Sequence, residues 1–541
     1  MTTTVAVIGG GVAGLSAAHH LIHKGFAVEL YERTGAAGGK SKSTMGQPSP
    51  SAKALPNLPG EHGFRFFPGF YRHLPATMAE IPEPSGGFVD GNLVQCPRIR
   101  LITSGGADIT APTHATTSAV DFVDMLRMVF AVPALGLGPA EVALFANKLL
   151  DIAIMPDADR FTVLEPQDWW TYVDAANQSA NYQRYLAAGL THSLVAADAH
   201  LMSARTGGVI ALQILKANGS TLGMDRILNG PTEVAWTYPW MTHLTNQGVK
   251  FHFSSEATAV TLGPNNLVAG VTVTGQAAPV QADYYVFAIP AERMGPLVSA
   301  QMTAVDPILA GIQALTTSWM NGIQYYLYAD VPINAGHTVY LDSPWALTSV
   351  SQQQFWQKYK LDVIGPGSVH GCLSVDISDW NAAGVHTTTK AARDCTADEI
   401  AQEVWGQLKH HLNQGTTVVL DDSNLAGYNL DNSLTPASST APATNSQPLL
   451  VNVKSSWALR PRAVTGIGNM FLAADYVRTW TDLATMEGAD EAARRAVNGI
   501  LAAAGSTRAP CDLWPLTDPD WTAPIRDAGN AVMPLADDLK P

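Results

Sequence analysis

Three glycines near the amino terminus have the spacing of a nucleotide-binding turn. Gly9, Gly11 and Gly14 directly follow the apolar run Val5–Ile8. In such a turn the missing side chains let the backbone approach a pyrophosphate, and the start of the next helix favours its negative charge. Glu32 follows at close to the roughly 20-residue offset at which a carboxylate meets a ribose hydroxyl. The spacing predicts a dinucleotide site rather than a structural glycine turn.

A second glycine turn, Gly38-Gly39-Lys40-Ser41, follows that acid. It is too far from Glu32 to belong to a simple nicotinamide site, and it carries a cation. Backbone amides and an ammonium group together suit phosphate oxygens. We therefore expect a more extended contact with the diphosphate than the first turn alone provides.

Apolar runs and striped segments supply the elements that must position these turns. Val5–Ile8 and Ala27–Tyr31 read as buried parallel strands, and the Leu15, Ala18 and Leu21 stripe predicts a helix between them. An alanine-rich helix is expected before Gly505. This alternation predicts the α/β class. Further strands are expected at 251–253, 257–262, 268–273, 284–289, 323–328 and 470–474.

Three other segments carry weaker signals. Residues 120–155 hold two apolar stripes around Pro133 and Pro139, which predict a helical hairpin. That hairpin is either ordinary core or a surface that dips into a bilayer and admits a lipid-soluble substrate. Residues 433–448, rich in Ser, Thr, Pro and Ala, predict a surface loop, and the proline-rich residues 506–541 predict an extended tail.

The stretch from Glu32 to Lys40 resembles the one that follows the second strand in flavin-dependent amine oxidases and carotene desaturases. Lys40 stands where that family usually has an arginine. The lysine ammonium group cannot make the two parallel hydrogen bonds that an arginine guanidinium makes. We therefore expect the diphosphate contacts to depend more on backbone N–H groups. Residues 61–71 are similar to the loop that runs past the flavin in plant-type phytoene and zeta-carotene desaturases, with Arg65 where those enzymes usually have histidine.

The most specific match lies near the carboxyl terminus. Residues 468–476, followed by 485–489, resemble the closing flavin motif of that family, with Ala474 in place of its usual glycine. Asp475, at a strand end, would approach the ribitol or diphosphate. A helix opening at Met486 would direct N–H groups at the pyrimidine edge of the flavin ring.

The resemblance implies a flavin-containing amine oxidoreductase, most similar to the desaturase branch, with non-covalent FAD. No cysteine lies in residues 457–469, where monoamine oxidases carry their thioether. The residues expected at FAD are Gly9, Gly11, Val12, Ala13, Gly14, Glu32, Arg33, Gly39, Lys40, Ser41, Gly63, Phe64, Arg65, Phe66, Ala257, Asp475, Thr485 and Met486. The catalytic candidates, expected near the reacting ring, are Arg65, Tyr476, Trp480 and Asp482.

The resemblance also implies a divided chain. A Rossmann-like FAD-binding domain is expected from the separated segments 1–75, 225–300 and 450–505. A mixed-sheet and helical substrate domain is expected from 76–224 and 301–449, with 506–541 as the tail. The expected fold is thus α/β with α+β insertions.

Amino-acid composition and net charge indicate which classes of binding partner suit this chain. Charged residues make up 14% of the chain and apolar ones 46%, and the net charge is −14. This balance argues against a nucleic-acid partner and favours a small apolar substrate. The four cysteines are far apart and no metal-ligand spacing is apparent, so neither a disulfide nor a metal site is expected. A signal peptide does not fit before Val5, which predicts a cytoplasmic protein, with peripheral membrane contact as the alternative for residues 120–155.

The predicted activity is FAD-dependent removal of hydrogen from a largely apolar substrate of isoprenoid or polyene type, with hydride passing to flavin N5. Electrons would return to oxygen, a quinone or another acceptor. An amine or amino-acid oxidase on the same fold is the first alternative. A flavin-dependent non-redox isomerase and a binding protein without flavin chemistry are the others.

Overall fold

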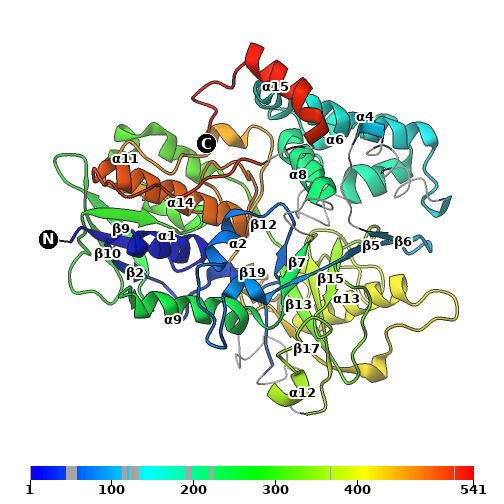
Figure 1. Cartoon of the computed structure of the whole chain (residues 1–541). Helices are drawn as coiled ribbons and strands as arrows, with labels where there is room; N and C mark the ends of the chain where they lie inside the picture. Colours follow the sequence, from blue (N-terminus) through cyan, green and yellow to red (C-terminus); the bar gives the residue numbers. More distant parts are fainter. Residues whose placement is uncertain are drawn as a thin grey trace.

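The structure is a computed structural model. It describes residues 2–43, 58–112, 118–120, 123, 126, 133–189, 198–217, 225–365, 367–516, 518 and 520–541. Two large sheets organise the chain, one in each half of the molecule (Figure 1). The mixed α/β architecture agrees with the predicted fold class.

The first sheet is parallel and draws its strands from distant parts of the sequence. Its order is β21-β11-β1-β2-β8. The long helices α1 and α14 pack against each other beside it, so the two ends of the chain share one core (Figure 1). The strands are β1 Thr4–Ile8, β2 Ala27–Tyr31, β8 Lys250–His252, β11 Tyr284–Phe287 and β21 Met470–Leu472; the helices are α1 Val12–His23 and α14 Met486–Ala503.

Smaller elements surround this sheet. An antiparallel pair and helix α9 complete this half of the molecule, and α9 packs against α1. The elements are α2 His73–Met78, α9 Tyr238–Asn246, β9 Ala257–Leu262, β10 Val268–Val273, α10 Ala291–Met294 and α11 Ala300–Val305.

The second sheet is mixed and has the order β17-β13-β16-β15-β14-β5-β6. Only the β14–β5 pair is parallel among its paired strands. Helix α13 (Ala397–Leu412) covers one face through Val404, Trp405 and Leu408. The strands are β5 Arg98–Ile102, β6 Asp108–Pro112, β13 Asn321–Leu327, β14 Thr338–Tyr340, β15 Leu347–Ser351, β16 Gly371–Ile377 and β17 Leu425–Leu430.

A three-stranded sheet, of order β3-β7-β4, the strand pairs β12-β20 and β18-β19, and the short helix α12 accompany the two large sheets. These elements are β3 Phe66–Phe67, β4 Leu93–Gln95, β7 Arg226–Leu228, β12 Thr317–Ser318, α12 Leu361–Ile364, β18 Leu434–Thr435, β19 Thr444–Asn445 and β20 Leu449–Leu450.

A helical region lies beyond the second sheet and contains α4 Pro139–Ile154, α5 Asp157–Asp159, α6 Trp169–Tyr172 and α8 Ala204–Ala217. The stripe of α4, including Val142, Phe145 and Leu149, is buried in its core. The core interpretation of this half of the 120–155 segment is therefore correct. Phe122, Val129 and Phe130 of the other stripe lie outside the described residues, whereas Leu126 is buried. Within the described residues, no helix combines the length and apolar character needed to cross a bilayer.

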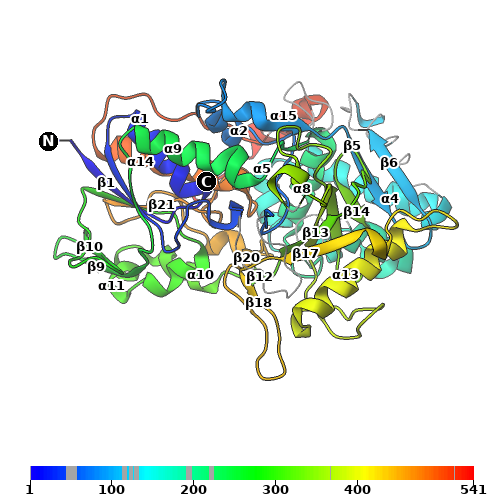
Figure 2. The same ribbon diagram turned by 90° about the horizontal axis from the view of Figure 1, so that it is seen from below.

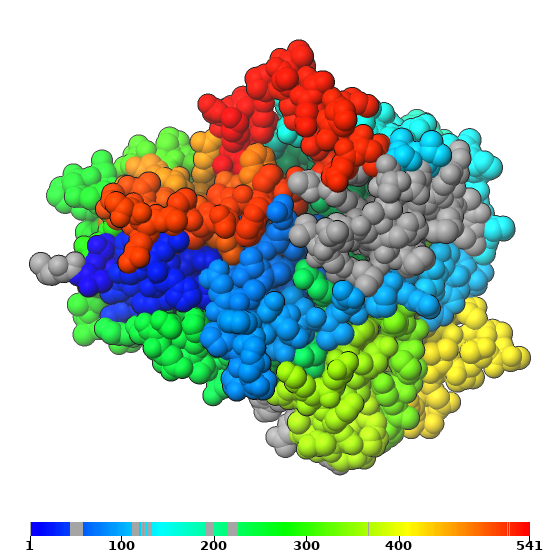
Figure 3. All heavy atoms as spheres, viewed as in Figure 1, coloured from blue at the N-terminus to red at the C-terminus, as the bar shows by residue number. Residues whose placement is uncertain are grey.

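The extended-tail prediction for residues 506–541 is wrong in its second half. Helix α15 (Ala523–Val532) forms there, because Pro524 stands in its first turn, where proline is tolerated. Asn530 accepts a hydrogen bond from the Asp157 backbone at 2.8 Å, so the helix packs on the helical region. Figure 3 shows this tail, in red, on the outer surface.

Residues 433–448, predicted as a surface loop, project from the surface as a hairpin in which β18 pairs with β19 (Figure 2). Its base is ordered because Asn445 donates to Asn321 Oδ1 at 2.8 Å and the Asn321 amide donates to Asp431 at 2.5 Å. Those buried contacts join residues more than 100 positions apart in the sequence, so local composition does not indicate them. They bring Ser446 and Gln447 to the main cavity.

Candidate functional site

A cavity of about 410 Å³ lies at the carboxyl ends of β1 and β2, between the two sheets. Both ends of the chain line it, since Gly11 and Glu32 face the same space as Asp475 and Met486. Ligands of open α/β sheets bind at this edge. The cavity is therefore the candidate functional site.

The three glycines of the first turn serve different purposes. A Cβ on Gly14 would lie 1.9 Å from the Gly9 carbonyl oxygen, so Gly14 permits α1 to pack on β1. Gly9 has φ of +107°, and its Cβ would lie 2.4 Å from the Ala288 carbonyl oxygen. A Cβ on Gly11 would meet only Gly39 Cα, at 3.8 Å, and Gly11 borders the cavity. Gly11 therefore keeps space open for a ligand rather than for the protein.

Glu32 is buried and held against the turn. Its Oε2 accepts a hydrogen bond from the Gly10 N–H at 2.8 Å, and its Oε1 accepts from the Thr34 backbone at 2.8 Å and hydroxyl at 2.7 Å. These bonds fix the carboxylate at the cavity wall. A carboxylate has about four lone-pair positions, so it can still accept hydrogen bonds from a ligand.

The second turn packs directly on the first. The Gly38 N–H donates to the Gly10 carbonyl at 2.7 Å, and Gly39 adopts φ of +56°. The Lys40 ammonium donates to the Pro448 carbonyl and lies 3.7 Å from Glu292. The Lys40 ammonium group is therefore already engaged by protein groups at this turn.

The closing motif reaches the cavity from the other side. Helix α14 begins at Met486, and the Thr485 hydroxyl caps it by accepting from the Gly488 N–H at 3.0 Å. Glu487, in the first turn of α14, accepts three hydrogen bonds from the backbone N–H groups of residues 72–74. The carboxyl-terminal motif is thereby fixed to the segment that follows residues 61–71.

The structure brings most of the predicted cofactor residues to this cavity. Gly14 is the exception, for the packing reason given above. The predicted residues that line the cavity are Gly9, Gly11, Val12, Ala13, Glu32, Arg33, Gly39, Lys40, Ser41, Gly63, Phe64, Arg65, Phe66, Ala257, Asp475, Thr485 and Met486.

Of the four catalytic candidates, only Arg65 is among the residues that line the cavity. Tyr476 is fully buried away from it, and Trp480 stacks beside the Arg495 guanidinium at 5.8 Å. Asp482 accepts from Arg205 at 2.6 Å and from Thr206 at 2.7 Å, and it also pairs with Arg460. These contacts give Asp482 a structural role, since it joins the closing motif to α8.

Asp376, on β16, is a cavity residue that the sequence analysis missed. Its carboxylate lies against Gly63, where an added Cβ would be 2.4 Å from Oδ1. Oδ1 is buried and makes no hydrogen bond within the described part of the chain. Burial raises the pKa of Asp376 to about 7, although the nearby Arg65 charge opposes this shift. A carboxyl group with such a pKa can exchange protons near neutral pH.

Arg65 and His62 stand beside Asp376 at the cavity. Arg65 donates to the Lys40 carbonyl at 2.9 Å, and its buried Nε has no hydrogen-bond partner among the described residues. His62 Nδ1 lies 2.6 Å from Asp431, whose pKa is lowered, against the effect of burial, by His62 and by hydrogen bonds. The polar end of the cavity therefore combines a fixed cation with a carboxyl group that titrates near neutrality.

The opposite wall is mostly apolar. It is built from the second sheet, the helical region and the segment around β20, so residues hundreds of positions apart meet there. These residues are Ile99, Met202, Ile210, Met320, Leu449, Leu450 and Val451. His337 also faces the cavity, and burial lowers its pKa to about 4, so this imidazole is neutral at pH 7.

Comparisons with known proteins agree with this arrangement. The family model described as flavin containing amine oxidoreductase matches residues 12–501. Cyclohexylamine oxidase from Brevibacterium oxydans IH-35A superposes with a TM-score of 0.60 at 14% identity, over 93% of this chain and 99% of that chain. No curated protein sequence matches the chain.

Two further solved structures have the same fold. Putrescine oxidase bound to putrescine gives a TM-score of 0.59 at 12% identity, covering 93% of this chain and 99% of that one. A putative protoporphyrinogen oxidase from Exiguobacterium sp. 255-15 gives 0.58 at 14% identity, covering 92% and 99%. At these identities the likeness concerns the fold.

Proposed function

Because the chain belongs to the family of flavin-containing amine oxidoreductases, we propose that it binds FAD non-covalently and removes hydrogen from a small, largely apolar substrate. The observation that carries this proposal is the single cavity on which the first glycine turn, Glu32 and the start of α14 converge. Bound FAD supplies a two-electron acceptor for the hydrogen that leaves the substrate.

The residues at the cavity fit an extended dinucleotide. Gly11 leaves room beside the amino terminus of α1 in which a diphosphate would fit, and Glu32, held at the cavity wall, would accept hydrogen bonds from ribose hydroxyls. At the other end, the start of α14 offers N–H groups to an electron-rich ring edge. The described cysteines are all buried and Cys96, Cys372, Cys395 and Cys511 are absent from the cavity lining, which supports non-covalent binding.

The substrate side of the cavity supports a molecule that is mostly apolar with one polar end. Met202, Ile210 and Leu450 offer apolar contact, whereas Arg65 and Asp376 offer a cation and a proton acceptor. Of two hydrogens removed from neighbouring atoms, one would leave as hydride, carrying both electrons to a bound flavin, and the other would leave as a proton. Asp376 Oδ1 would accept that proton, and the Arg65 charge would favour the ionised carboxylate that accepts it.

An amine substrate is the second candidate. The family description and the amine oxidases among the solved neighbours favour it, and Asp376 could take a proton from a substrate ammonium group. The experiment that separates the two mixes oxidised protein anaerobically with cyclohexylamine, putrescine, a polyene and an isoprenoid alcohol. Bleaching of the flavin only by the amines would replace the apolar-substrate proposal, and bleaching by none would leave neither supported.

A first prediction concerns the cofactor itself. The purified protein is expected to be yellow, with one FAD per chain, because both motifs contribute to one site. Acid precipitation should release the flavin into the supernatant, where its spectrum and mass identify it. Flavin that stays with the pellet would demonstrate a covalent link.

A second prediction tests the assignment of Glu32 to the adenosine end. Glu32→Ala should weaken FAD binding by about 1.5 to 3 kcal/mol, the range for hydrogen bonds to a charged group. Glu29→Ala is the matched control, since Glu29 lies on the same strand but pairs with Lys250 outside the cavity. Equal FAD affinities for the two variants, measured by titration of the apoprotein, would contradict the assignment.

A further inference from the structure

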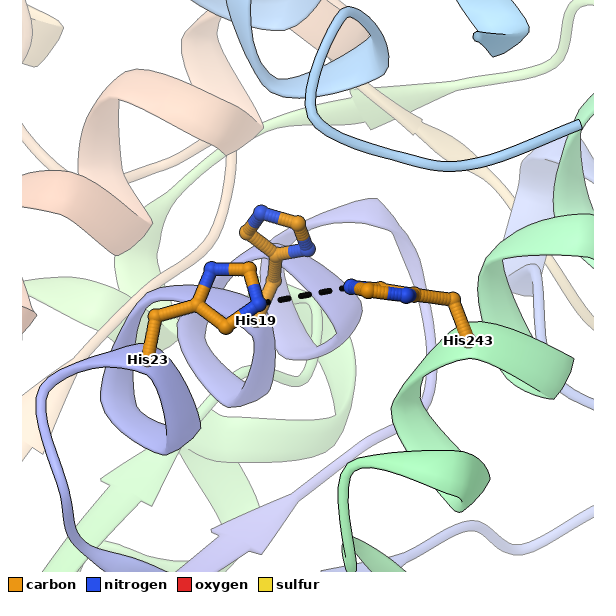
Figure 4. A group of neighbouring side chains, drawn as sticks. All are labelled: His19, His23 and His243. Carbon is orange, nitrogen blue, oxygen red and sulfur yellow. Dashed lines mark hydrogen bonds between the residues drawn. The ribbon is translucent and has the colours of Figure 1, made fainter. Parts of the chain in front are cut away.

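Three histidine side chains converge outside the cavity, on the far end of α1. His19 and His23 come from α1 and His243 comes from α9, and Figure 4 shows the three rings directed at one another. The expectation of no metal site overlooked the i, i+4 spacing of His19 and His23, which places both on one face of the helix. His243 completes the cluster only because α9 packs on α1.

The spacing of the ring nitrogens fits a tetrahedral ion. His23 Nε2 lies 3.3 Å from His243 Nε2. Zn²⁺ binds imidazole nitrogen at about 2.0–2.1 Å, so two nitrogens of a tetrahedral site lie about 3.3–3.4 Å apart. One ligand atom from each of the three histidines can be chosen so that all lie within 4.8 Å of one another. Small side-chain rotations would therefore complete the site.

A carboxylate stands behind two of the rings. Glu80 Oε2 accepts from His19 Nε2 at 3.1 Å and lies 3.8 Å from His23 Nδ1. This contact fixes the tautomer of His19, which leaves Nδ1 with a lone pair. Nδ1 is buried and has no hydrogen-bond partner among the described residues, in a side chain that is 0% exposed. A metal-bound histidine typically has this arrangement, with its second nitrogen on a carboxylate.

We propose that His19 Nδ1, His23 Nε2 and His243 Nε2 bind a divalent first-row transition ion, for which Zn²⁺ has the fitting geometry. Glu80 orients the rings of His19 and His23, and a fourth position stays open because the His23 and His243 side chains are partly exposed. The ion would connect α1 to α9. The ion would thereby stabilise α1, whose other end carries the glycine turn. This metal site does not depend on the proposed function.

The test uses the full chain with its flavin, treated with a chelator, dialysed, and titrated with ZnCl₂. One Zn²⁺ per chain is expected by elemental analysis after gel filtration, with a rise in Tm. Glu80→Gln should weaken Zn²⁺ binding about 10- to 100-fold. The double variant His23→Gln, His243→Gln should lose both the bound Zn²⁺ and the rise in Tm.

His370→Gln is the matched control. His370 is half-exposed and lies 3.8 Å from the Asp362 carboxylate, but it belongs to no described cluster of potential metal ligands. It should bind Zn²⁺ as the parent does. If the parent retains no more Zn²⁺ than the double variant, the histidines form only a hydrogen-bonded group and the proposal is wrong. Unchanged far-ultraviolet circular dichroism of the metal-free variants ensures that a loss of binding does not reflect unfolding.

Discussion

Gly11→Val is expected to yield a folded, colourless protein. A valine Cβ at this position meets only Gly39 Cα, at 3.8 Å, and the backbone of Gly11 is extended, with φ of −74°, which valine readily adopts. The added methyl groups would therefore fill the cavity where a diphosphate is expected, without disturbing the protein around them. We expect loss of FAD from the purified protein and failure of the apoprotein to bind added FAD in the micromolar range.

Two other glycines make this prediction specific. Gly35→Val should retain the yellow colour, because Gly35 is exposed and a Cβ there meets no atom within 4 Å. Gly14→Ala should instead reduce the stability of the apoprotein, by about 1–3 kcal/mol or more, since its Cβ would overlap the Gly9 carbonyl oxygen. Thermal denaturation of the apoproteins separates the effects. A Gly11→Val protein that stays yellow would show that the diphosphate does not bind at this turn.

The glycine-turn half of the candidate site could be predicted because its determinants are local. Strand β1, the glycine turn and α1 follow one another within the first 23 residues, and each has its own periodicity or composition. Predicted strands also ended close to the observed ones, although β11 stops at Phe287 and β21 at Leu472. Buried parallel strands are recognised by short β-branched and aromatic runs, and that pattern does not depend on the partner strand.

The half of the cavity that contains Asp376 could not be predicted in the same way. Asp376 reaches the cavity because β16 pairs with β13 in a register that places it opposite Gly322, and next to Gly63. Nothing local to Asp376 signals that register, since β16 is buried along its whole length. Asp482 is the opposite case, because it was expected near the reacting ring but does not line the cavity. It follows the closing motif in sequence, but it adopts φ of +43° and turns towards Arg205 and Arg460 instead of the cavity.

Asp376→Asn is expected to reduce kcat/KM by about 10²- to 10⁴-fold, the usual contribution of a positioned general base. Asparagine keeps the size and the contacts with Gly63, but it cannot accept the substrate proton. In the parent protein, activity should rise with pH through about 7, as the Asp376 carboxyl loses its proton. This limb of the pH profile should be missing from the residual activity of the variant. Asp330→Asn is the control, because burial also raises the pKa of Asp330, which lies outside the cavity lining.

Stability should change in the opposite direction to activity. The folded-state pKa of Asp376, about 7, lies above the ordinary value of 3.8, so the folded protein binds the proton more tightly than the unfolded chain. The stability that the protonated Asp376 carboxyl gives the folded protein is therefore fully present below pH 3.8, and it is lost as the pH rises towards 7. Above pH 7 the buried charge is a cost, on the order of a few kcal/mol, that Asp376→Asn removes. At pH 8 the variant apoprotein should have the higher Tm. A variant that is less stable than the parent at pH 8 and retains full activity would show that Asp376 holds the fold together and does not serve as the base.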